Sequence, residues 1–134
     1  MRLALSILSC VLFVALTSSA ALARDPFNGR WQVTMIPDPE TANAGNEQFD
    51  DTLIFEKDLF SSEACAQYGF KPVKYELDSR AITAATFTAS PKSETDGSAK
   101  WEGFTTGQDI RGTVVWTKAD GTVLRYSFQG ARQQ

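Results

Sequence analysis

The stretch that decides the fold class is AKWEGFTTGQDIRGTVVWTKADGTVLRYSFQG, residues 99–130 of a chain of 134 residues. Apolar and polar side chains alternate along 99–106, 109–118 and 122–130, as they do in β-strands that have one buried face. Gly107-Gln108 suits a two-residue type II′ turn, and Ala119-Asp120-Gly121 suits a three-residue hairpin loop. The C-terminal third is therefore predicted to be an antiparallel meander.

The same alternation extends toward the N-terminus. Shorter strand patterns cover 31–35, 53–56, 73–78 and 85–89, and Lys57-Asp58 predicts a tight turn after the second of them. Turn signals recur about every 8–12 residues, a spacing typical of a β-sandwich or a β-barrel. One segment departs from this pattern. SSEACAQYG, residues 61–69, has a serine N-cap and a glycine after its end, which predicts a short helix over residues 61–68.

The longer of two predicted loops, residues 37–51, carries five carboxylates and no basic residue. Calcium binds through six to eight oxygen ligands, but the spacing of these acids matches no calcium-binding loop pattern. We interpret them as solvated charges. Adjacent Asp50 and Asp51 are expected on opposite faces of the strand that they begin, so they do not form a pair of acids.

Residues 1–23 have the features of a secretory signal peptide: Arg2, an apolar run over 3–16, and small residues before a cleavage site after Ala23. The run is shorter than the roughly 20 apolar residues that a transmembrane helix needs. We therefore expect an exported protein, periplasmic or extracellular and not membrane-spanning, whose single domain comprises residues 24–134. Cleavage removes Cys10 and leaves Cys65 as a lone thiol, which we interpret as a small buried side chain.

The composition excludes several classes of function. The formal net charge is −3, and a slightly acidic chain is not suited to binding nucleic acid. The chain has no histidine, which excludes an imidazole base and a histidine-ligated metal. It also lacks a phosphate-binding loop and a nucleophile elbow. We therefore expect no enzyme, no catalytic residue, no metal site and no cofactor, and we expect a monomer.

Aromatic side chains follow one parity of the predicted strands. If the first of them faces the interior, the others in the candidate ligand-binding set do so too: Trp31, Phe55, Tyr75, Phe87, Trp101, Trp116 and Tyr126. Trp116 is expected to meet Trp101 across one hairpin and Tyr126 across the next, and such cross-strand pairs contribute about 0.2–1 kcal/mol each. Two interpretations stay open: the rings fill a solid core, or they line a cavity for one small ligand.

A Gly29-Arg30-Trp31 tripeptide opens the first predicted strand, and Arg125 and Arg132 lie in and after the last one. A Gly-x-Trp motif combined with a basic residue at the end of the chain resembles the calycin superfamily, which includes lipocalins, fatty-acid-binding proteins and avidin-like barrels. The resemblance implies an all-β, antiparallel up-and-down barrel of about eight strands. It also implies that Trp31 closes one end of the barrel, with Arg132 or Arg125 packed across the indole.

The calycin resemblance also implies a function: an exported protein that binds a small apolar or amphipathic molecule inside the barrel. In that case the loop 37–51 and the helix over 61–68 are expected near the mouth of the barrel. The alternative is a protein-interaction module with a filled core, such as a periplasmic inhibitor of a secreted hydrolase. The segment from Trp116 to Phe128 is also similar to small exported bacterial proteins, a likeness that implies no activity.

Overall fold

The elements of the fold are known from a computed structural model that describes residues 25–81 and 84–134. The strands are β1 (Gly29–Pro37), β2 (Phe49–Glu56), β3 (Leu59–Ser62), β4 (Val73–Ala81), β5 (Ala84–Ala89), β6 (Lys92–Ser93), β7 (Gly97–Thr105), β8 (Asp109–Thr117) and β9 (Val123–Arg132). Two short helices, α1 (Pro39–Asn43) and α2 (Glu63–Ala66), interrupt them. The export signal predicted over residues 1–23 lies outside the described residues and stays a prediction.

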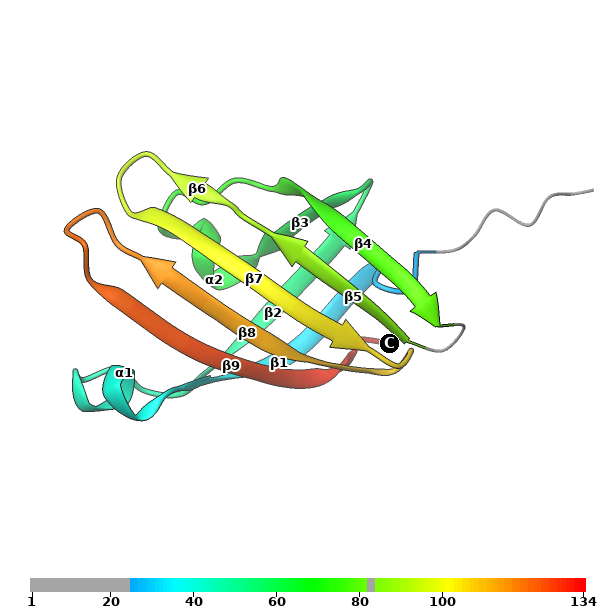
Figure 1. The fold of residues 1–134 in the computed structure, drawn as a ribbon, viewed down its shortest axis with the longest axis horizontal. Helices are drawn as coiled ribbons and strands as arrows, with labels where there is room; N and C mark the ends of the chain where they lie inside the picture. Colours follow the sequence, from blue (N-terminus) through cyan, green and yellow to red (C-terminus); the bar gives the residue numbers. More distant parts are fainter. Residues whose placement is uncertain (1–24, 82–83) are drawn as a thin grey trace, which may run out of the picture.

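The strands form one closed antiparallel sheet (Figure 1). Strands β1 to β5 pair in chain order, β7 pairs with β8 and β8 with β9, and the pairs β9–β1 and β5–β7 close the circle. Strand β6 is a short addition that pairs with β7. Over the described residues the protein is thus an eight-stranded up-and-down barrel, as predicted. None of the helices in 25–81 or 84–134 is long and apolar enough to cross a membrane.

The helices differ from the prediction. Helix α2 is shorter than residues 61–68 at both ends: Ser62 is its N-cap and accepts a hydrogen bond from the Cys65 backbone, and Gln67 is its C-cap. Helix α1 forms within the segment predicted to be a loop. Its signals were present in the sequence, because Asp38 is a preferred N-cap and Pro39 is favoured in the first turn. Five residues give too little periodic pattern to reveal such a helix.

Aromatic rings fill the barrel around Phe55, which is fully buried. Ring centroids lie near the Phe55 ring at 4.8 Å for Phe87, 5.1 Å for Tyr75, 5.2 Å for Phe27 and 5.2 Å for Phe60. Most of these pairs are tilted or edge-to-face, the arrangements that aromatic quadrupoles favour. Of the two interpretations left open by the sequence, the solid core therefore holds for this half of the interior.

Two glycines give the core rings room on the opposite wall. Gly103 on β7 pairs with Gly112 on β8. A Cβ on Gly103 would lie 2.3 Å from the Phe87 ring, and one on Gly112 would lie 2.6 Å from the Phe128 ring. The sheet register is continuous at this pair, so the glycines mark close packing rather than a bulge.

Trp31 and Phe27, both fully buried, close the end of the barrel at which β1 begins and β9 ends. Figure 1 shows the C-terminus at this end. The Trp31 indole donates to the Phe27 carbonyl at 2.8 Å, and the Arg132 guanidinium carbon lies 4.3 Å from the centre of the Trp31 ring. The same guanidinium donates hydrogen bonds to the backbone carbonyls of Pro26 (2.5 Å), Asn28 (2.6 Å) and Gly107 (3.3 Å). Arg132 thus fastens the N-terminal segment and the β7–β8 turn to this end of the barrel.

Replacing Arg132 tests how much this end of the barrel contributes to stability. Arg132→Met is expected to lower the free energy of unfolding by about 2–3 kcal/mol, because a stacked cation and its charge-assisted hydrogen bonds are lost together. The matched control is Arg125→Met on the same strand, where the side chain is exposed. Urea denaturation of both variants checks this, and equal midpoints would contradict the role given to Arg132.

Candidate functional site: a cavity at the helical end of the barrel

A cavity of about 580 Å³ opens at the end of the barrel opposite Trp31. Its apolar wall comprises Met35, Trp101, Trp116, Leu124 and Tyr126. Its other side comes from helix α2, from the segment between α1 and β2, and from the start of β2, which supply Ala64, Cys65, Asn46, Glu47 and Asp51. These segments lie at the mouth because the connections from β1 to β2 and from β3 to β4 both lie at this end of the barrel. An apolar wall facing a few polar groups is the usual composition of a small-molecule site.

Trp116 shapes the rim of the cavity. Its indole donates to the carbonyl of Asp96 at 2.6 Å, so the β6–β7 turn fixes the orientation of the ring. The Tyr68 ring lies 5.1 Å away and the Phe70 ring 5.9 Å away, centroid to centroid. The Lys118 ammonium lies 5.4 Å from the centre of the Trp116 ring, within cation–π distance.

Trp101 lies two residue positions farther from the mouth than Trp116, on the neighbouring strand β7, and it is 1% exposed. Its indole N–H is buried and has no hydrogen-bond partner among residues 25–81 and 84–134. A buried donor without an acceptor costs about 1–3 kcal/mol, and native proteins rarely contain one. Trp101 is also one of the residues that line the cavity.

Asp51 is the carboxylate on the polar side of the cavity, and it is 5% exposed. Its Oδ2 accepts from the Ser62 hydroxyl at 2.5 Å, and its Oδ1 accepts from the backbone N–H groups of Thr52 (2.8 Å) and Ala64 (3.0 Å). Burial raises the pKa of the Asp51 carboxyl, while these hydrogen bonds oppose the rise. Asp51 therefore holds α2 against β2 and places a carboxylate in the cavity wall.

Asp50 has the opposite orientation, as the alternation of a strand predicts. It is exposed, and its Oδ1 accepts from the Thr34 hydroxyl on the outer face at 3.2 Å. Within residues 25–81 and 84–134 the acids, like the cysteine, form no cluster that could hold a metal ion.

Cys65 also lines the cavity and is half-buried. Burial is the main cause that raises the pKa of the Cys65 thiol to about 11, and the charge of Asp51 contributes to this rise. The Ser62 hydroxyl opposes this shift. A thiol with this pKa is protonated at neutral pH, so it belongs to the wall of the cavity and is a poor nucleophile.

The seven aromatic residues predicted to bind a ligand divide into two groups. Trp101, Trp116 and Tyr126 line the cavity. The other four pack in or against the solid core near the closed end: Trp31, Phe55, Tyr75 and Phe87.

Trp116 was predicted to lie directly opposite Trp101 on one neighbouring strand and Tyr126 on the other, and the register of the sheet differs from this. Trp116 pairs with Ala99 and Leu124, whereas Trp101 and Tyr126 both pair with Val114. Of the two arginines predicted to cover Trp31, Arg132 lies over the ring and Arg125 is exposed on β9.

The sequence predicted the loop 37–51 and the helix over 61–68 near the mouth, where both segments line the cavity, but it did not predict Asp51 in the cavity wall. Asp51 shares the inward parity of Leu53 and Phe55, so an acid in a buried row was a readable signal. The hydrogen bond between Ser62 and Asp51 joins the adjacent strands β3 and β2. It could be predicted only if the register of this strand pair were known. The unpaired N–H of Trp101 has no sequence signal, because it depends on where every neighbouring acceptor lies.

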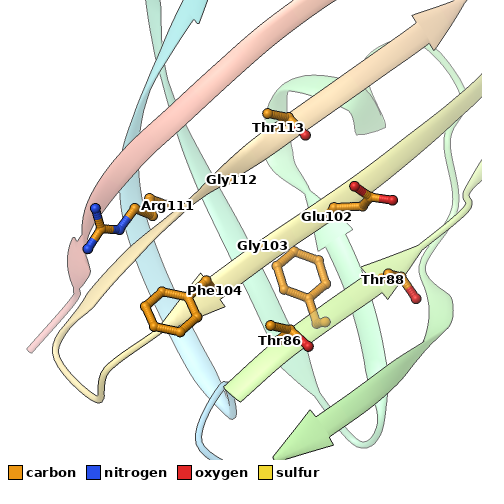
Figure 2. A pocket seen from close by; sticks show the side chains of 9 residues that line it. Thr86, Thr88, Glu102, Gly103, Phe104, Arg111, Gly112 and Thr113 are labelled. Carbon is orange, nitrogen blue, oxygen red and sulfur yellow. The ribbon is translucent and has the colours of Figure 1, made fainter. Parts of the chain in front are cut away.

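A second depression, of about 380 Å³, lies on the outer face of β5, β7 and β8. Figure 2 shows outward side chains around the Gly103–Gly112 pair, among them Thr88, Glu102 and Arg111. Its floor is the sheet itself, with the Phe87 ring beneath, so it offers mainly backbone that is already paired in the sheet. The cavity at the mouth, with its aromatic wall and buried polar groups, is the stronger candidate site.

Comparison of the chain with protein-family models, with curated proteins and with solved structures gave no significant match. The architecture and the chemistry of the cavity therefore carry the functional argument.

The protonated thiol of Cys65 gives a test of the cavity wall. In a Cys10→Ser background, iodoacetamide at pH 8 is expected to alkylate the folded protein at least about tenfold more slowly than the same chain in urea, because a thiol of pKa about 11 is almost entirely protonated at this pH. The rate in the folded protein should rise as the pH approaches 11. Mass spectrometry of quenched samples gives both rates, and equal rates would show that Cys65 does not lie in a desolvated wall.

Proposed function

We propose that the protein is an exported binding protein that holds one small amphipathic molecule in the cavity at the helical end of the barrel. The observation that carries this proposal is the cavity-wall residue Trp101, whose buried indole N–H lacks an acceptor within the described chain. A ligand with an oxygen or nitrogen acceptor would satisfy that donor and remove its cost. The carriage of a ligand thus explains a feature that the free protein leaves uncompensated.

The size and lining of the cavity support the same conclusion. Pockets that bind small molecules measure roughly 300–1,000 Å³, and a volume of about 580 Å³ lies within that range. Met35, Leu124 and the aromatic rings suit an apolar body, whereas Asp51 and Asn46 suit a polar head. The resemblance to calycins agrees with this proposal, since lipocalins hold one small ligand inside a barrel.

A second candidate is a protein-interaction module, such as an inhibitor of a secreted hydrolase. The filled core around Phe55 favours it, because a filled barrel is a rigid support for surface loops. Tyr68 (48% exposed) and Phe49 (39% exposed) add apolar surface at the mouth, where a partner could insert a side chain. In this case the cavity would receive part of a protein rather than a free molecule.

Native mass spectrometry of the protein purified from its own source distinguishes the two candidates. A discrete extra mass of small-molecule size, lost on denaturation and kept in reductant, is expected for the binding protein. Co-purification of a whole protein chain would favour the interaction module, and a bare monomer would count against a tightly held ligand.

A cavity-filling substitution tests where the ligand binds. Ala64→Phe is expected to reduce the binding of decanol at least about tenfold, because the new ring occupies the cavity while the backbone N–H still bonds Asp51. Ala66→Phe is the matched control, since Ala66 is exposed on the same helix. Intrinsic tryptophan fluorescence measures binding in both variants. Undiminished binding to Ala64→Phe would place the site elsewhere.

A further inference from the structure

We propose that the molecule bound in this cavity is a cation: an amphipathic amine whose ammonium group pairs with Asp51 at the mouth. This inference rests on the proposed function, and it adds the charge of the ligand's head group.

Asp51 is a buried carboxylate with no cation beside it in the described part of the chain. Arg30–Glu63 and Lys100–Glu102 form ion pairs, and neither pair includes Asp51. The charge that acts most clearly on Asp51 is that of Glu63, which has the same sign. Buried charges are normally paired with an opposite charge, so Asp51 leaves a position for a cation unfilled.

The hydrogen bonds of Asp51 leave one acceptor position free. A carboxylate offers about four lone-pair positions, two on each oxygen. Oδ1 uses both of its positions on the N–H groups of Thr52 and Ala64, and Oδ2 accepts from Ser62. One position on Oδ2 therefore remains among the described residues. An ammonium group donates charge-assisted hydrogen bonds, which are about twice as strong as neutral ones.

The aromatic rim offers the second half of a cation site. The face of Trp116 already receives a cation, the Lys118 ammonium at 5.4 Å from the ring centre. Tryptophan is the best aromatic partner for a cation, and Tyr68 lies beside it. With the Asp50 carboxylate directed to Thr34 on the outer face, the charged side chains that line the cavity are Glu47, Asp51 and Lys118, so acids outnumber the base. An anionic head group would meet net repulsion there.

Matched probes that differ in head-group charge test the inference: decylammonium, decanoate and the neutral decanol. Decylammonium is expected to bind at least about tenfold more tightly than decanoate, as a charge-assisted hydrogen bond to a buried carboxylate implies. Tryptophan fluorescence at concentrations below micelle formation gives the three affinities.

Two variants assign the preference to residues. Asp51→Asn is expected to lower the affinity for decylammonium, taken relative to the affinity of the same variant for decanol, about tenfold or more. Lys118→Gln is expected to strengthen decylammonium about two- to fivefold, because the ligand no longer competes with Lys118 for the face of Trp116. Lys74→Gln, an exposed lysine on β4, is the control and should change no affinity. Lys118→Gln tests the site even if Asp51→Asn loosens α2.

The outcomes separate this inference from the function on which it rests. Equal affinities for decylammonium and decanoate, with decanol blocked by Ala64→Phe, would overturn the cation and keep the binding function. Tighter decanoate, weakened by Lys118→Gln, would overturn it in favour of an anion. Failure of every probe to bind would count against the proposed function itself.

Discussion

The stacking of Arg132 on Trp31 is the contact on which the arrangement of this barrel depends. It joins the last strand to the first, and its hydrogen bonds to the carbonyls of Pro26 and Asn28 hold Phe27 inside the barrel. With that end closed, the rings of Phe87 and Tyr75 pack against Phe55 at centroid distances of 4.8 and 5.1 Å. The space that remains lies at the other end, beneath α2. The filled half of the interior is thus the half that Arg132 and Trp31 close, and the cavity lies in the other half.

Asp51 has a comparable influence at the open end. One carboxylate accepts hydrogen bonds from β3, α2 and its own strand, so it positions the helix and also charges the wall of the cavity. The two effects cannot be separated structurally, because the bonds that fix α2 are the same bonds that keep Asp51 desolvated. Any ligand that reaches Asp51 therefore contacts the carboxylate that also holds helix α2 in place beside the cavity.

The fold was largely readable from the sequence, because period-2 alternation and turn glycines act locally. Gly107 and Gly121 both adopt positive φ, as their predicted turns require. The closure of the barrel needed the added evidence of Gly29, Trp31 and Arg132, since strand spacing alone does not distinguish a barrel from a sandwich. The division of the interior was not predictable. Parity places a ring inside the barrel but does not say whether Phe27, a residue before the first strand, will fill the space beside it.

The polar half of the site shows a second limit of the sequence. Asp51 was visible as an acid in a buried row, yet its meaning depends on Ser62 and Ala64, which approach it only after β2 and β3 pair. Trp101 and Trp116 point to the same face of the sheet, but Trp101 pairs with Val114, two residues before Trp116. A shift of two residues in register therefore separates a residue of the cavity wall from a residue of the rim.

The three tryptophans of the chain lie at three depths along one axis of the barrel. Trp31 is fully buried at the closed end, Trp101 is 1% exposed in the middle, and Trp116 is half-buried at the rim. Each indole has a different polar environment: a backbone carbonyl for Trp31, none described for Trp101, and the Asp96 carbonyl beside an ammonium for Trp116. Tryptophan fluorescence therefore reports on depth in this barrel, because a structural change at the mouth, in the middle or at the closed end alters the surroundings of a different tryptophan.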